Sequence, residues 1–298
     1  MNRRLFFFAA AAFAALLGVG PGVQAAEPMK VSASFSILGD MVKQVGGDRV
    51  DVFTFVGPNG DAHVYEPTPA DAKELSESKI LFINGLGLEG WMTRLEKSSG
   101  FKGTVVTATN GITPRKMVED EKTVTDPHAW QNLANGRIYV ANIRDALITA
   151  DPGGKATYET NAQKFLDGIA QMETTVKAAI AKLPPERLKI ITTHDAFGYF
   201  GAAYGVEFIA PEGVSTESEA SAKDVAKIIT QIKKEKIPAV FLENVTDSRL
   251  LDQIAKETGA KIGGTLYSDA LSPPDGSAGT YLDMFRNNIE TMSAALSS

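Results

Sequence analysis

The chain has no cysteine among its 298 residues, and this absence excludes several kinds of site. No disulfide can stabilise the fold, no thiolate can bind a metal, and no lipid can be attached through a cysteine side chain. The sequence contains neither a G-x-S-x-G nor an H-E-x-x-H motif, so it carries no signature of a serine hydrolase or a zinc protease. After residue 26, no apolar run is long enough to cross a bilayer.

Basic residues are fewer than acidic residues. The chain has 30 lysines and arginines against 36 aspartates and glutamates, which gives a net charge of −6. An acidic protein is a poor partner for nucleic acid and favours cations. We therefore expect no nucleic-acid binding.

The N-terminus has the pattern of an export signal. A positively charged start and an apolar run over residues 5–17 precede Val23-Gln24-Ala25, which offers small residues for cleavage. We expect residues 1–25 to be a signal peptide, cleaved near Ala25, and the rest of the chain to be a periplasmic protein.

The remaining sequence alternates short apolar runs with amphipathic segments, which predicts parallel sheets covered by helices. The expected strands are 29–36, 50–56, 79–84, 104–107, 188–193, 207–210, 239–242 and 261–266. The expected helices are 37–46, 69–78, 88–98, 135–150, 155–183, 196–204, 222–235, 249–257 and 281–296. Thr68 is the expected N-cap of the helix 69–78, with Pro69 at its first position.

The stretch Lys155–Leu183 is long for a helix and contains no proline. Its apolar residues recur at nearly the helical period, at Phe165, Ile169, Met172, Val176 and Ile180. A helix of this length, about 43 Å at 1.5 Å per residue, can join two lobes as a rigid rod. We expect an α/β fold of two lobes, each with a parallel sheet flanked by helices, over residues 26–154 and 185–298, with the connecting helix at 155–184. An ordinary long helix within one domain is the alternative.

The chain contains only three histidines, and each lies near a strand end or a turn. His63 follows the turn after strand 50–56, His128 precedes the helix 135–150, and His194 ends the strand 188–193. Ligands of parallel α/β sheets bind beyond the carboxyl ends of the strands, so we expect the three to meet between the lobes. Three imidazoles and one carboxylate would complete a four-coordinate metal site. The simpler alternative is three unrelated surface or core histidines.

The fourth ligand should come from a strand end of the second half. Asp269, after strand 261–266, is the better candidate, and Glu243 is its competitor. Other neighbours of the histidines can assist them. Asp126 and Asp195 are placed to orient imidazoles, and Asp195 is equally suited to cap a helix. Two aromatic residues, Trp130 and Phe197, either wall the site or belong to the core.

Four segments resemble, in order, the ligand segments of the zinc/manganese solute-binding proteins of ABC importers. They are HVYEPTP at 63–69, DPHAW at 126–130, THDAFGYF at 193–200 and YSD at 267–269. The resemblance extends over nearly the whole chain after the leader and includes the long helix. It implies that His63, His128, His194 and Asp269 are metal ligands, that a divalent metal is the transported substrate, and that the partner is the membrane permease of an ABC importer. We expect a monomer.

The donor set bears on the choice of metal. That family varies between histidine and glutamate at the third ligand, which is His194 here. Imidazole suits Zn²⁺, whereas Mn²⁺ tolerates more oxygen donors, so we expect Zn²⁺, with Mn²⁺ as the alternative. One departure points away from Zn²⁺: many zinc-specific relatives carry a long histidine-rich loop before the second ligand segment, but this chain has only a short acidic stretch, 117–122. We interpret this stretch as a solvated loop, with attraction of a cation as the alternative.

Two other classes of protein compete with a transport protein. A metal-dependent hydrolase would need an open position for water, which four protein ligands do not leave. A metal-binding adhesin of the same fold is the second competitor. We therefore expect a metal-capture protein that is not an enzyme.

Overall fold

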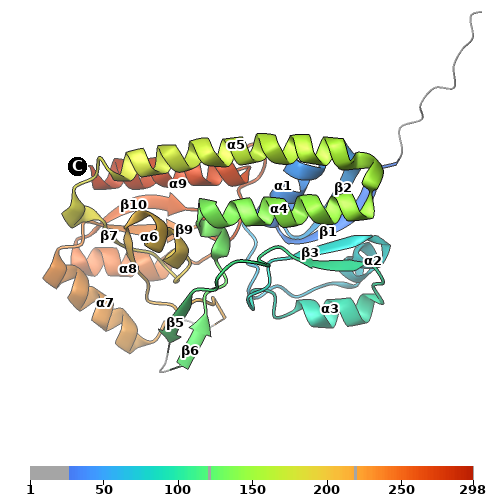
Figure 1. The fold of residues 1–298 in the computed structure, drawn as a ribbon. Helices are drawn as coiled ribbons and strands as arrows, with labels where there is room; N and C mark the ends of the chain where they lie inside the picture. Colours follow the sequence, from blue (N-terminus) through green and yellow to red (C-terminus); the bar gives the residue numbers. More distant parts are fainter. Residues whose placement is uncertain (1–26, 120–121, 218–219, 298) are drawn as a thin grey trace, which may run out of the picture.

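Two parallel β-sheets lie side by side beneath a layer of long helices in the computed structural model, which describes residues 27–119, 122–217 and 220–297 (Figure 1). The expected signal peptide, 1–25, lies outside the described residues. The first sheet has the order β2-β1-β3-β4. Its strands are β1 (Met29–Phe35), β2 (Val50–Val56), β3 (Ile80–Ile83) and β4 (Thr104–Thr107).

The second sheet has the order β10-β9-β7-β8, and its paired strands are also parallel. Its strands are β7 (Lys189–Ile191), β8 (Glu207–Ile209), β9 (Ala239–Glu243) and β10 (Lys261–Leu266). Counted from its first strand, each sheet has the order 2-1-3-4, so the two halves share one topology. The expected α/β class with two parallel sheets is confirmed.

The helices follow the expected pattern closely. They are α1 (Ser36–Gly46), α2 (Pro69–Glu77), α3 (Met92–Ser99), α4 (Leu133–Ala150), α5 (Lys155–Ile180), α6 (Gly198–Tyr204), α7 (Ala222–Glu235), α8 (Arg249–Thr258) and α9 (Tyr281–Leu296). Thr68 caps α2 as expected, because its side chain accepts from the Asp71 N–H while the Asp71 carboxylate accepts from the Thr68 N–H. None of the helices in these ranges is long and apolar enough to cross a membrane.

Two helices begin later than expected. α3 starts at Met92 rather than at residue 88, because turns precede it and Leu86 has a positive φ of 57°. α6 starts at Gly198 rather than at residue 196. The Asp195 N–H donates to the carbonyl of Gly213, which holds the preceding segment as a loop against the chain that follows β8.

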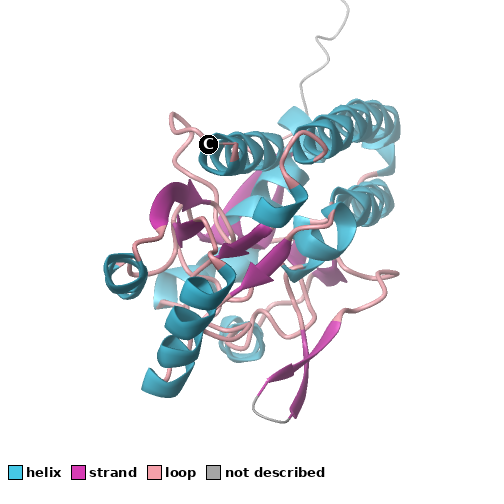
Figure 2. Cartoon of the chain, turned by 90° about the vertical axis from the view of Figure 1, so that its left-hand side faces the viewer, coloured by secondary structure: helices cyan, strands magenta, loops and turns pink. Residues whose placement is uncertain are grey.

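The stretch 117–122 was expected to be a solvated loop, and this expectation was wrong. Residues 117–119 and 122 belong to an antiparallel hairpin of β5 (Lys116–Glu119) and β6 (Lys122–Thr125), and residues 120–121 lie outside the described residues. Each strand has only four residues and no Asn-Gly or Asp-Gly turn joins them, so the usual hairpin signal is absent. Figure 2 shows the hairpin projecting from the body of the molecule.

The long helix α5 runs along both halves of the molecule (Figure 1). It has 26 residues, about 39 Å of helix, and ends at Ile180, where tighter turns replace the helix through Leu183. Its buried residues include the five predicted ones and follow the helical period: Tyr158, Ala162, Phe165, Ile169, Met172, Val176 and Ile180. α5 packs against α1 and α4 of the first half and α9 of the second, and so ties the halves together.

One large hydrophobic core extends through both halves. It includes Phe35 and Phe82 from the first sheet and Phe241 and Leu266 from the second. A smaller cluster fills the space between the second sheet and helices α7 and α8. Because burial of apolar surface dominates the stability of a fold, this shared core resists separation of the two halves.

Candidate metal centre

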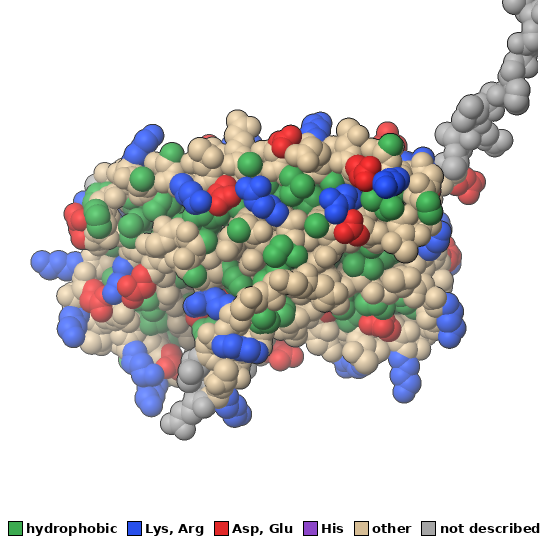
Figure 3. Space-filling view, viewed as in Figure 1, with side chains coloured by type: hydrophobic (Ala, Val, Ile, Leu, Met, Phe, Trp, Pro, Cys, Tyr) green, Lys and Arg blue, Asp and Glu red, His purple; other side chains and the backbone are tan. Residues whose placement is uncertain are grey.

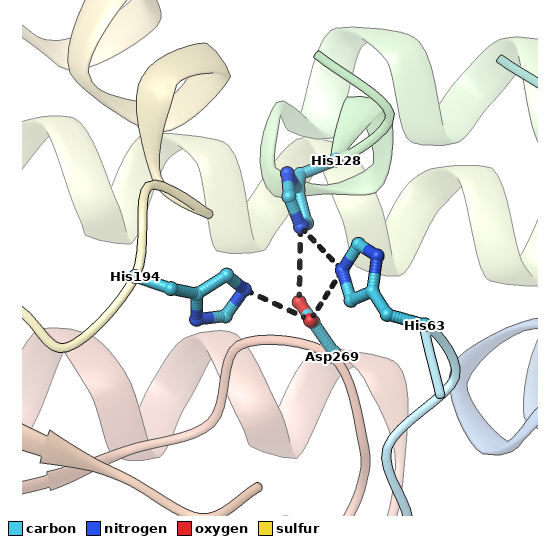
Figure 4. A group of neighbouring side chains, drawn as sticks. All are labelled: His63, His128, His194 and Asp269. Atoms are coloured by element: carbon cyan, nitrogen blue, oxygen red, sulfur yellow. Dashed lines mark hydrogen bonds and ion pairs between the residues drawn. The ribbon is translucent and has the colours of Figure 1, made fainter. Parts of the chain in front are cut away.

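Four side chains converge in the interior, and they are the four that the sequence predicted (Figure 4). Asp269 lies at the centre of their contacts. Its Oδ2 is 3.0 Å from His194 Nε2 and 3.2 Å from His63 Nε2, and its Oδ1 is 3.6 Å from His128 Nε2. The Nε2 atoms of His63 and His128 are 3.3 Å apart.

The four distances above are close to the edge length of a metal-centred tetrahedron. Zn²⁺ binds nitrogen and oxygen at about 2.1 Å, so neighbouring donors of a tetrahedral site lie about 3.4 Å apart. The four donor atoms all lie within 4.8 Å of one another, and the contacts given above run from 3.0 to 3.6 Å. The arrangement can therefore accept one small divalent ion with little movement.

The cluster is closed to solvent. His128, His194 and Asp269 are fully buried, and His63 is 9% exposed. No histidine appears on the face of the molecule drawn in Figure 3. Of the four side chains, only His63 offers an approach from outside.

His63 comes from the loop after β2, as predicted. Two hydrogen bonds fix this loop: the His63 N–H donates to Asp61 Oδ1 at 2.8 Å, and the indole of Trp91 donates to the carbonyl of Ala62 at 2.8 Å. The Asp61 carboxylate also accepts from the hydroxyl of Thr216, which lies in the second half. The His63 loop is therefore connected to both halves.

His128 was predicted to lie just before the helix 135–150, which is confirmed, and beyond the carboxyl end of a parallel strand, which is wrong. It follows β6 of the antiparallel hairpin and directly precedes a short 3₁₀ turn, Ala129–Gln131. Asp126 orients it, as predicted: Asp126 Oδ1 lies 2.9 Å from His128 Nδ1 and accepts from the His128 N–H at 3.0 Å. This contact turns Nε2 towards the centre of the cluster.

His194 follows β7, and Glu243 orients it. Glu243 Oε2 lies 2.7 Å from His194 Nδ1, while Oε1 accepts from the N–H groups of Thr193 and His194 at 2.7 and 2.9 Å. Glu243, the competitor for the fourth ligand position, thus contacts His194 from behind instead of joining the four donors. Asp195 neither contacts an imidazole nor caps α6, whose N-cap is Phe197.

Asp269 follows β10, and residues next to His128 hold its loop. The carbonyl of Ser268 accepts from the indole of Trp130 at 2.9 Å and from the amide of Gln131 at 2.7 Å. The Trp130 ring also lies 5.3 Å from the His128 ring, so Trp130 forms a wall of the site. Sequence reasoning missed Gln131, whose position directly after the DPHAW segment was the available signal.

Phe197 belongs to the core rather than to the site. Its ring stacks on Phe208 at 4.9 Å, away from the four donors. Of the two aromatic candidates, one is therefore a site wall and the other packs the second half.

The charges of the cluster are strongly coupled. Burial lowers the pKa of His128, but the charges of Asp269 and Asp126 outweigh it and raise the pKa to about 9. Burial likewise lowers the pKa of His194, and the charges of Glu243 and Asp269 raise it well above its usual range. Burial raises the pKa of Asp269, and the two imidazoles lower it well below its usual range. In the absence of an ion, protons on His128 and His194 balance the buried carboxylates.

The fold and this cluster define a class of protein: two parallel α/β halves joined by a long helix, with a buried donor set of three imidazoles and one carboxylate between them. The chain belongs to the family described as zinc-uptake complex component A, periplasmic, which matches residues 31–295. The resemblance seen in the ligand segments is confirmed.

Named relatives and solved structures agree with this family. The manganese-binding lipoprotein MntA of Halalkalibacterium halodurans is 33% identical over 273 residues, 91% of this chain and 89% of that protein. The iron-binding protein YfeA of Yersinia pestis is 32% identical over 269 residues, 90% of this chain and 86% of that protein.

Among solved structures, the manganese-bound periplasmic metal-binding protein from Candidatus Liberibacter asiaticus has a TM-score of 0.81 at 34% identity, covering 90% of this chain and 99% of that chain. The periplasmic zinc-binding protein TroA from Treponema pallidum has a TM-score of 0.86 at 30% identity, covering 91% of this chain and 100% of that chain.

Proposed function

We propose that this protein captures one divalent transition-metal ion at His63, His128, His194 and Asp269 and delivers it to the membrane permease of an ABC importer. The spacing of the four buried donor atoms, 3.0 to 3.6 Å for the contacts through Asp269, carries this proposal. Four protein donors enclose the ion completely, which suits capture and transport rather than catalysis.

The relatives support this role and its location. Their names describe substrate-binding lipoproteins of metal ABC transporters and periplasmic metal-binding proteins. We propose that the chain acts in the periplasm as a monomer, with residues 1–25 removed as a signal peptide. The absence of cysteine means that, unlike relatives named as lipoproteins, this sequence has no residue for a lipid on a cysteine.

The two sheets and the long helix that runs along both of them suggest how the chain divides into lobes. We propose an N-terminal lobe of residues 26–154, the connecting helix over 155–184 and a C-terminal lobe of 185–298. His63 and His128 come from the first lobe and His194 and Asp269 from the second, so binding of an ion would join the lobes at their interface.

The two competing classes fit the site less well. In a hydrolase, one position on the metal stays open for water and a general base lies near it, but here all four donors face one another. An adhesin would also bind its metal at such a site. If the metal-loaded protein kept its ion after mixing with the permease, the result would favour an adhesin over a transport protein. We propose transport and no enzymatic activity.

The donor set favours Zn²⁺ as the substrate, because three imidazoles and one carboxylate suit a borderline ion. The names of the relatives include manganese, iron and zinc, and manganese is frequent among them. Mn²⁺ is therefore the alternative substrate.

A titration of metal-free protein tests the proposed function. Isothermal calorimetry with ZnCl₂ should give one ion bound per chain. If a binding free energy of about 10 to 16 kcal/mol is shared among four ligands, His63→Ala should cost about 3 kcal/mol, roughly 100-fold in affinity. Gln163→Ala, an exposed substitution on α5, should leave affinity unchanged. Full affinity of the His63→Ala variant would contradict the proposed ligand set.

The choice of metal can be tested at His194. His194→Glu exchanges a nitrogen donor for a hard carboxylate and should lower the ratio of Zn²⁺ to Mn²⁺ affinity by at least about tenfold. Because Glu243 lies 2.7 Å from His194 Nδ1, the new carboxylate would face a like charge. The double variant His194→Glu/Glu243→Gln removes that repulsion and is the cleaner comparison. Competition titrations with both metals measure the ratio. An unchanged ratio in both variants would mean that cavity geometry, not donor type, sets the preference.

A further inference from the structure

The base of the β5–β6 hairpin is closed by a pair of charged residues. Arg115 directly precedes β5 and Asp126 directly follows β6, and the Asp126 N–H donates to the carbonyl of Arg115 at 3.0 Å. The Nε of Arg115 also lies 3.2 Å from Asp126 Oδ2. The hairpin thus brings a cation to the carboxylate that orients His128.

The two oxygens of Asp126 have separate partners. Oδ1 is used by His128, through both its N–H and its Nδ1, whereas Oδ2 faces Arg115. The carboxylate is fully buried, and Oδ2 has no hydrogen bond within the described part of the chain. A buried charge without compensation is costly, and on the Oδ2 side of Asp126 the guanidinium of Arg115 supplies that compensation.

Helix α6 of the other half holds this pair. The hydroxyl of Tyr199 accepts from the Arg115 N–H at 2.8 Å and donates to the carbonyl of Asp126 at 3.3 Å. Gly198 packs directly on the pair: a Cβ there would lie 2.4 Å from Arg115 Nε and 2.7 Å from Asp126 Oδ2. No side chain fits at residue 198 unless the pair moves.

We propose that Arg115 is a positioning residue for His128, and that Gly198 provides the space in which it acts. This inference rests on the proposed function. Arg115 fixes the Asp126 carboxylate, Asp126 fixes the His128 ring, and α6 of the second half seats the pair. The second half therefore contributes to the orientation of a ligand that belongs to the first half.

The expected consequence concerns how long an ion stays bound. Loss of the partner that orients a ligating imidazole typically weakens metal binding about 10- to 100-fold. Without Arg115, Asp126 can turn its free oxygen towards solvent and release the ring of His128. The rate at which an ion associates with the other donors should change little. The weaker binding should therefore appear mainly as a faster dissociation rate.

The experiment is a double-mutant cycle with Arg115→Ala, Gly198→Ala and both together. Zn²⁺-loaded protein is mixed with excess chelator in a stopped-flow instrument, and the dissociation rate is recorded. Each single variant should release Zn²⁺ about 10-fold faster or more. In the Arg115→Ala background the second substitution should have a smaller effect, because the contact of the new methyl group with the guanidinium is gone and only its contact with Asp126 Oδ2 remains.

Two further measurements separate positioning from general destabilisation. The absorption spectrum of the Co²⁺-loaded protein reports the coordination geometry and should change in both single variants. The thermal midpoint of the metal-free protein reports folding. Arg144→Ala removes a half-exposed arginine paired with Asp145 elsewhere, and Gly90→Ala adds a methyl group that meets no atom within 4 Å. Both controls should keep the wild-type rate and spectrum.

The outcomes are distinct. If the wild-type protein fails to bind Zn²⁺ or Co²⁺, the proposed function is wrong. If it binds both ions and Arg115→Ala keeps the wild-type rate and spectrum, the role of Arg115 is overturned. Should Arg115→Ala fail to fold, Arg115→Lys decides: it retains the charge but not the planar guanidinium, and an intermediate dissociation rate is expected. A wild-type rate and spectrum in that variant, with Gly198→Ala also unchanged, would contradict the proposal.

Discussion

Replacing Asp269 by asparagine should lower the affinity for Zn²⁺ by a factor on the order of 10² to 10³. Asparagine keeps the shape of the side chain but removes the only negative charge among the four donors. Leaving a buried charge without its partner typically costs about 3 to 5 kcal/mol, and here the ion would be that charge. Because Asp269 contacts all three imidazoles, no other described side chain in the cluster can replace it.

The matched control is Asp275→Asn, which makes the same chemical change at an exposed position six residues away. It should leave the affinity unchanged. Calorimetric titration measures both variants, and circular dichroism of the metal-free proteins checks that each is folded. An Asp269→Asn affinity within a factor of about three of wild type would mean that the carboxylate is not a ligand.

Most of the fold could be predicted from the sequence because its elements carry strong local signals. Strands β2, β4 and β10 and helices α7 and α9 have the expected bounds. The two helices begin after the capping residues Ser221 and Thr280 and bury residues at the helical period, and glycines flank the three strands in the sequence. The β5–β6 hairpin had neither kind of signal, and was missed.

The four clustered residues could be predicted because each lies in a short segment that resembles a known ligand segment. Their orientation could not be predicted. Glu243 and Asp269 both lie at strand ends, and sequence alone cannot say which points into the cavity. In the structure, Glu243 points back to the N–H groups of Thr193 and His194, and this leaves the central position to Asp269.

Contacts between distant segments were also beyond the reach of the sequence. Trp130 and Gln131 hold the carbonyl of Ser268, more than 130 residues away, and Tyr199 holds the base of the hairpin. Such contacts depend on how the two halves pack, which no local pattern encodes. They are also the contacts that set the geometry of the site.

Zn²⁺ affinity should fall steeply on acidification, and the fall should begin well above the ordinary histidine pKa of about 6.5. An imidazole must be neutral to bind a metal, and protons compete wherever the pH lies below its pKa in the metal-free protein. The pKa of His128 is raised to about 9 and that of His194 is also raised, so both carry protons near pH 7. Binding then releases two protons, and the apparent affinity should fall about 100-fold per pH unit.

Calorimetry or chelator competition between pH 6.5 and 7.5 measures this slope. The variant Asp126→Asn provides the comparison, since it keeps an acceptor for His128 Nδ1 but removes one of the charges that raise the pKa of His128. For this variant, the dependence of Zn²⁺ affinity on pH between 6.5 and 7.5 should correspond more nearly to the release of one proton, about tenfold per pH unit. A flat affinity for wild type between these pH values would contradict proton competition at the two histidines.

The same shifts predict opposite pH trends for the metal-free and metal-loaded forms. A raised pKa of His128 in the folded protein stabilises the metal-free form below about pH 6.5, and that contribution is lost as the pH rises through about 9. The apparent affinity for the metal ion rises over the same pH interval, because fewer protons must be displaced from the imidazoles. The difference in thermal midpoint between loaded and metal-free protein should therefore widen from pH 6.5 to 9. A difference that is constant or narrows over this interval would mean that protons and the metal ion do not share these imidazoles.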